Sequence, residues 1–287
     1  MASTITLKRR IGSIRNTRQI TKAMELVAAS KMRRAQDQAL RSRAYRDATY
    51  GLLTRLGAIS EVSRQPLFMR RDVKTRLYVV VTSNSGLAGA YNANVLKMLT
   101  HSVLEDRNNG IKSEVVTIGN RGAQFARRME HVNLIAVYPA FGDQPTANDL
   151  RPVLNTIVDR YLKKDIDEVR LIYTLFKSNL VQLTSQITLM PATVGKDETA
   201  ESFTNFEPDV ESVLHHTGLR LIEAQLWQAV LEGLASEQSA RMIAMKNATD
   251  NAGDLIAEYT LEFNTARQAA ITQELAEITG GVEALND

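Results

Sequence analysis

The residues with the clearest chemical potential form a glycine-containing loop, Ser83–Ala90, which reads Ser-Asn-Ser-Gly-Leu-Ala-Gly-Ala. The loop follows an apolar run and leads into a helical segment, which is where many α/β proteins bind phosphate through backbone N–H groups. Its glycine spacing does not match G-x-G-x-x-G, and the chain contains no G-x-x-x-x-G-K-[ST]. We therefore interpret the loop as a tight structural turn and expect no bound nucleotide or other cofactor.

The sequence gives no indication of a metal site or of thiol chemistry. The chain has no cysteine, which excludes disulfides, thiolate metal sites and a cysteine nucleophile. The four histidines have neither metal-ligand spacing nor an accompanying cluster of acids; they are His101, His131, His215 and His216. We expect no metal site and no catalytic residues.

Polar residues interrupt a regular stripe in the C-terminal region. The stripe runs from Trp227 to Tyr259 in alternating steps of four and three, which is typical of a coiled-coil seam. Its other members are Leu231, Leu234, Gln238, Arg241, Met245, Ala248, Ala252 and Leu255. Gln238 and Arg241, and further along Gln268 and Thr272, allow two interpretations. They either set the helix register on a solvated face or form a docking surface, because arginine and glutamine can hydrogen-bond a surrounding protein loop.

The N-terminal region carries a looser stripe and an opposite charge. The stripe consists of Ile20, Met24, Ala28, Met32, Ala35 and Ala39. Residues 1–60 contain 13 Lys/Arg and 3 Asp/Glu, whereas residues 208–287 contain 4 Lys/Arg and 13 Asp/Glu. Opposite charges favour antiparallel pairing of the two ends. An exposed ion pair contributes only about 0–1 kcal/mol, so the apolar seam must supply most of the stability.

A basic helix also raises the alternative of a nucleic-acid-binding coiled coil. Against it, the Lys and Arg residues go round the expected helix instead of along one face. Aromatic residues that could stack on bases are missing before Tyr45.

The proline-containing middle of the chain predicts an α/β domain. All six prolines lie between Pro66 and Pro208, which leaves two long arms free of this helix breaker. Short β-branched runs alternate with helix-like segments, as in βαβ units with a mostly parallel sheet. The runs cover 77–81, 115–118, 134–137 and 169–173, the helix-like segments cover 91–106, 121–130 and 147–163, and an edge strand is expected at 182–189.

The predicted fold is thus α/β: a Rossmann-like domain with a mostly parallel sheet, plus a long antiparallel coiled coil of the N- and C-terminal helices. We place the N-terminal helix at 1–60, the α/β domain at 73–205 and the C-terminal helix at 209–280, with Gly280-Gly281 ending it. A C-terminal helix of this kind would be about 100 Å long. No run approaches the 18 apolar residues of a membrane span, and the N-terminus lacks a secretion-signal core, so a cytosolic chain is expected.

Three blocks resemble the signatures of F-type ATP synthase γ subunits, bacterial type. The first reads ITKAMELVAASKM at 20–32, the second SEQSARMIAMKNATDNA at 236–252 and the third NTARQAAITQEL at 264–275. The resemblance implies a rotor shaft without an active site of its own, inserted among α and β subunits. It also implies an α/β foot that touches the ε subunit and the membrane c ring, at the cytoplasmic face of the plasma membrane, with membrane contact only through the c ring.

Matching residue by residue, the resemblance implies roles for particular positions. Arg241, Gln268 and Thr272 match positions that contact β, while Lys22 and Met24 lie on the facing helix and join Met245 and Leu255 at the seam. The foot contacts with ε and the c ring are expected at Arg41, Arg43, Tyr45, Glu207 and Asp209. The loop departs from the family pattern T-D-R-G-L-C-G-G at Asn84, Ser85, Ala88 and Ala90.

Overall fold

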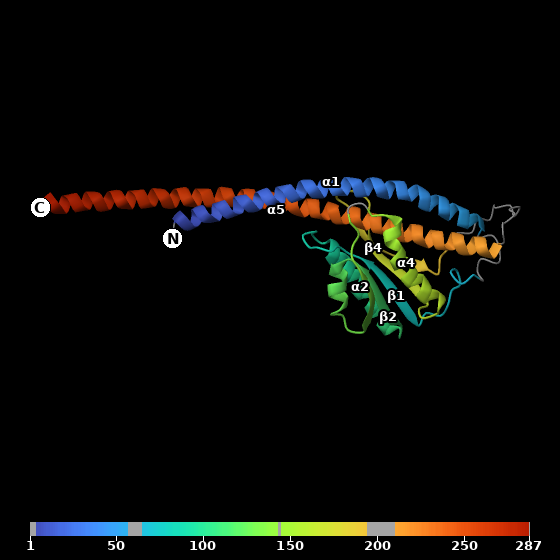
Figure 1. Ribbon diagram of the computed structural model, residues 1–287. Coiled ribbons are helices and arrows are strands. Elements are labelled where there is room, and N and C mark those ends of the chain that lie inside the picture. Colours follow the sequence, from blue (N-terminus) through green and yellow to red (C-terminus); the bar gives the residue numbers. More distant parts are fainter. Residues whose placement is uncertain (1–3, 57–64, 143–144, 194–209, 287) are drawn as a thin grey trace. The chain divides into compact units, whose positions relative to one another are not determined.

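The computed structural model describes residues 4–56, 65–142, 145–193 and 210–286. Its contacts divide the chain into two compact units, Ala28–Arg241 and Met1–Val27 with Met242–Asp287. Two long helices, α1 (Thr4–Leu56) and α5 (Val210–Asn286), run through both units (Figure 1). Each unit is described on its own below.

The larger unit is built on a five-stranded sheet with the order β3-β2-β1-β4-β5. The first four strands are parallel and β5 is antiparallel at the edge, with Tyr173 opposite Ser185. This confirms the prediction of a mostly parallel sheet with an edge strand. The strands are β1 (Thr75–Val81), β2 (Lys112–Ile118), β3 (Val132–Tyr138), β4 (Glu168–Phe176) and β5 (Gln182–Met190).

Helices cover both faces of the sheet. One face packs against α2 (Tyr91–Asn108) and α3 (Asn120–Ala126), with Val95 and Leu99 of α2 among its buried residues. The other face packs against α4 (Ala147–Leu162) and the first part of α5. Because the central strand β1 is buried on both faces, it reads from Leu77 to Val81 as a continuous apolar run without alternation.

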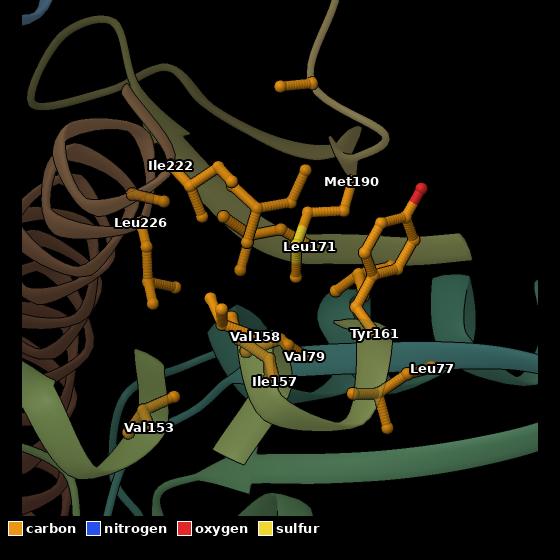
Figure 2. Close-up of a cluster of buried hydrophobic side chains, with 14 of the residues drawn as sticks. Leu77, Val79, Val153, Ile157, Val158, Tyr161, Leu171, Met190, Ile222 and Leu226 are labelled. Carbon is orange, nitrogen blue, oxygen red and sulfur yellow. The ribbon is translucent and has the colours of Figure 1, made fainter. Parts of the chain in front are cut away.

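The second face holds the larger core. Figure 2 shows Ile222 and Leu226 of α5 facing Leu171 of β4 and Val158 of α4. All four side chains are buried, and each contributes roughly 1.5–3 kcal/mol of apolar burial. Helix α5 is therefore an integral layer of the α/β unit as well as a long helix.

In the smaller unit, α1 and α5 pair antiparallel. Thr249 Oγ1 donates to Thr21 Oγ1 at 2.8 Å, and the guanidinium of Arg10 lies 5.9 Å from the centre of the Tyr259 ring. The buried residue is Thr21, whereas the predicted stripe residue Ile20 is 60% exposed, so this part of the prediction was wrong. Steps of 3.5 residues from the buried Leu7 and Ile11 lead to Thr21 and not to Ile20.

The end of α5 also differs from the prediction. Helix α5 continues through Gly280 and Gly281 to Asn286, so the glycine pair does not end it. A glycine inside a helix costs roughly 0.5–1 kcal/mol relative to alanine. The cost is tolerable because glycine permits a helical backbone even though it does not favour one.

Candidate functional site: helix α5 and the loop after strand β1

The usual ligand crevice of this fold is occupied by the protein's own helix. In open α/β sheets, ligands bind at the carboxyl ends of the strands where the strand order reverses. Here that point lies between β1 and β4. A Cβ added to Gly233 of α5 would lie 3.0 Å from Val81 Cγ1 and 3.3 Å from the Tyr91 hydroxyl. The cavity that remains beside the helix holds about 20 Å³, which is room for about one water molecule.

The polar groups of the loop Ser83–Ala90 form hydrogen bonds within the loop and to neighbouring residues of the α/β unit. The Ser83 hydroxyl donates to Ser85 O at 2.5 Å, and the Ser83 amide donates to Asn92 Oδ1 at 3.0 Å. Asn84 binds the backbone of Ala140 twice, accepting from its N–H at 2.9 Å and donating to its carbonyl at 3.0 Å. These bonds support the interpretation of the loop as a structural turn. They also give Asn84 and Ser85, two of the positions that depart from the family pattern, defined structural roles.

Arg241 contacts this same loop. It is only 9% exposed, its Nη1 lies 2.8 Å from Glu237 Oε1, and its Nη2 donates to Ser85 Oγ at 3.2 Å and Gly86 O at 3.3 Å. Arg241 thus has partners within the chain, and its expected contact with another subunit stays a prediction. Sequence reasoning missed the contact with the loop because the loop is 155 residues away along the chain.

Tyr91, the first residue of α2, is buried beside this ion pair. Burial raises the pKa of Tyr91 well above its usual 10.0; the Glu237 carboxylate raises it further and the Arg241 guanidinium lowers it. The region between α5 and the loop is thus shielded from water. Hydrogen bonds and charges act more strongly there than at a surface.

Two of the predicted foot residues are exposed and one is not. Arg41 and Tyr45 are exposed, whereas Arg43 Nη2 lies 3.1 Å from Glu232 Oε1 and donates to Phe176 O at 3.3 Å. Arg43 therefore ties α1 to α5 and β4 within the larger unit. Glu207 and Asp209 lie outside the described residues.

The predicted seam residues of the smaller unit differ in burial. Met245 is buried and Met24 is half-buried, while Lys22 is exposed and its Nζ binds Glu25 at 3.0 Å. Leu255 is 41% exposed; the buried residue of that turn is Ala252. The burial thus does not support the placement of Leu255 on the seam.

Gln268 and Thr272 lie on a stretch of α5 that is exposed throughout. The contacts of Thr21 with Thr249 and of Arg10 with Tyr259 set a register in which Thr4, the first residue of α1, falls near Ala266. Every residue from 267 to 279 is exposed, and Figure 1 shows α5 continuing past the start of α1. The exposed residues include a stripe spaced by four and three: Ile271, Leu275 and Ile278.

The described residues contain no group of three or more His, Cys, Asp or Glu side chains placed to hold a metal ion. In the same part of the chain, we find no helix both long enough and apolar enough to cross a membrane.

Comparison with known proteins identifies the family. The model of the ATP synthase family matches residues 3–285. ATP synthase gamma chains of two Xylella fastidiosa strains, M23 and Temecula1, are 39% identical over 288 residues, covering 99% of this chain and all of theirs. The chain belongs to the ATP synthase gamma family.

Solved structures agree with the fold of the gamma family. A chain of the Tetrahymena thermophila mitochondrial ATP synthase, from a structure of the central stalk and c ring, matches with a TM-score of 0.65 at 23% identity. It covers 80% of this chain and 99% of that one. A chain from the Euglena gracilis enzyme, in a structure of OSCP, F1 and c ring, gives a TM-score of 0.70 at 17% identity, covering 98% and 94%. At these identities the likeness shows the shared fold.

Proposed function

We propose that this chain is the central rotor shaft of an F-type proton-translocating ATP synthase. It transmits rotation between the membrane c ring and the catalytic β subunits, and the active sites lie on other subunits. Its partners are the α and β subunits, the ε subunit and the c ring. It acts at the cytoplasmic face of a bacterial plasma membrane, without binding nucleic acid or a cofactor.

The observation that carries this proposal is the exposed end of α5. A lone helix is marginally stable in water, and most helical stability comes from packing an apolar face. The stretch from 267 to 279 has such a face in Ile271, Leu275 and Ile278, yet it lies beyond Ala266, the residue opposite the start of α1 at Thr4. Exposed apolar side chains in a row are typical of an interaction surface. A surrounding assembly would supply the missing contacts.

The same surface supports the proposed contacts with β. Gln268 and Thr272 lie on this stretch, with polar groups accessible to another subunit. A single asymmetric helix cannot present one face to several surrounding subunits at once. Each β subunit would meet a different face, so each would be biased towards a different nucleotide affinity, and rotation would permute the biases. For Arg241 the internal contacts favour a different role, developed below.

A photo-crosslinking amino acid at Thr272, in the assembled enzyme, tests this proposal. We expect crosslinks to the large nucleotide-binding subunits. A matched probe at the exposed His101 of α2 should not form them, because it lies on the α/β unit. Failure of the Thr272 probe to capture those subunits in an active complex would argue against the shaft.

The nucleic-acid alternative is tested on the chain as purified from cells. It predicts that the chain retains DNA or RNA, and that this binding is lost as the salt concentration rises, because the binding releases counterions. The rotor proposal instead predicts co-purification with larger nucleotide-binding subunits. Salt-sensitive retention of nucleic acid without these subunits would favour the alternative.

A further inference from the structure

Helix α5 carries buried polar side chains on two opposite sides where it crosses the carboxyl edge of the sheet. At about 100° per residue, Ser236 and Ser239 lie about 60° apart on one side. Arg241 points about 140° away from Ser236. All three residues are buried. Buried polar groups are kept only with partners, so each side implies a specific neighbour.

The serine side faces the β4–β5 hairpin. Ser236 Oγ donates to Thr174 O of β4 at 3.2 Å, and Ser239 Oγ donates to Asn179 O in the turn at 2.8 Å. Both acceptors are backbone carbonyls, so these bonds hold the hairpin itself and not a movable side chain.

The arginine side faces the loop after β1. Arg241 donates to Ser85 Oγ and Gly86 O, while Glu237, one turn earlier on α5, holds the same guanidinium. A Cβ added to Gly89 would lie 3.8 Å from Ala240 O, so the loop backbone packs directly on the helix backbone.

We propose that Ser236, Ser239 and Arg241 form a polar clamp that fixes the rotation of α5 about its own axis within the α/β unit. Apolar packing is non-directional, whereas hydrogen bonds require alignment of donor and acceptor. A turn of α5 by one residue's angle would break both sides at once. The three side chains are positioning residues. The mechanical meaning rests on the proposed function: torque received by the α/β domain reaches α5 through the clamp.

Hydrogen exchange in the full-length chain tests the clamp apart from any rotor role. In the double variant Ser236→Ala/Ser239→Ala, we expect the amides of Lys177 and Ser178, which bind Val181 O, to exchange about tenfold faster. The amides of Ser83–Tyr91 should not change. Thr265→Ala is the matched control, because that hydroxyl binds Leu261 O of its own helix.

Arg241→Gln should give the opposite pattern. The amides of Ser83–Tyr91 should exchange faster, and the exchange rates of the hairpin amides should not change. Arg241→Lys should resemble Arg241→Gln, because one ammonium lacks the planar fork that binds Glu237 and the loop together. Unchanged exchange at both segments, or equal acceleration across the whole sheet, would overturn the clamp.

The assembled enzyme then tests what the clamp does. Clamp variants should lower the number of protons pumped per ATP hydrolysed, compared among complexes that assemble to the same extent as the wild type. If exchange changes as expected and the pumping ratio does not, the mechanical role is refuted although the clamp exists. If exchange does not change, the clamp is refuted whatever the protein's function.

Discussion

The pair formed by Arg43 of α1 and Glu232 of α5 offers a sharp test because its two members are unequally buried. The Glu232 side chain is 1% exposed, whereas that of Arg43 is 38% exposed. Gln228 Nε2 also donates to Glu232 Oε1 at 2.6 Å, while Glu232 Oε2 has no hydrogen-bond partner among the described residues. Removing one partner should therefore cost far more than removing the other.

The expected sizes follow from this asymmetry. Arg43→Met leaves a buried carboxylate, which typically costs about 3–5 kcal/mol; we expect about 3 kcal/mol because the Gln228 amide remains. Glu232→Leu leaves a part-exposed guanidinium that keeps Phe176 O and water, but the buried Gln228 amide loses its acceptor, so we expect a cost of about 1–2 kcal/mol. The double variant should cost no more than Glu232→Leu alone, because it leaves no buried charge unpaired.

Urea unfolding of the full-length chain measures these differences. The only tryptophan, Trp227, lies on α5 five residues before Glu232 and packs against the core, so its fluorescence reports this region. The slope of free energy against urea should stay constant across the four proteins, which makes the midpoints comparable. A larger loss for Glu232→Leu than for Arg43→Met would refute the reasoning. So would a double variant as unstable as the sum of the two single ones.

Three further predictions concern other contacts. Gly233→Val should lower the free energy of unfolding by about 1–3 kcal/mol, since its side chain would crowd Val81 Cγ1. Gly281→Val should not lower it, because the space at its Cβ position is open. Equal thermal midpoints for the two glycine variants would contradict this prediction. Thr21→Val with Thr249→Val should be nearly neutral in urea unfolding, because both partners of the seam hydrogen bond are replaced together. For Tyr91, the raised pKa means that the unfolded chain loses its proton first, so stability falls as pH rises above about 10. Tyr91→Phe should reduce this alkaline loss in unfolding measured from pH 8 to 11, and an unchanged loss would count against the burial of the hydroxyl.

Much of the fold could be predicted because local pattern and burial agree. The run 77–81 is apolar without alternation, and in the structure it lies in a central strand buried on both faces. Where apolar residues are sparse, the pattern fails. Ile20 is apolar but exposed, and the seam is held by the hydroxyls of Thr21 and Thr249. A search for regularly spaced hydrophobic residues does not detect a seam position that is occupied by a polar residue.

The site was harder to predict, because its contacts join distant parts of the chain. The family resemblance assigned Arg241 and Arg43 to contacts with other subunits. Within the chain, each also binds a partner supplied by the fold: the loop at Ser85 and Gly86 for Arg241, and Glu232 for Arg43. No helical periodicity encodes these pairings. Gln268 and Thr272 are exposed, and their role in contacting β stays a prediction.

The position of α5 is consistent with the coupling role proposed for this chain. The crevice between β1 and β4 is where such sheets usually hold a small molecule that comes and goes. Here Gly233 lets the helix approach Val81 closely, and the buried serines and Arg241 bind the backbone on both sides of the crevice. A bound ligand would have to displace covalently attached chain, which is present at very high effective concentration. The same contacts that fill the ligand site therefore bind the α/β domain firmly to the helix that, in the proposed function, it turns.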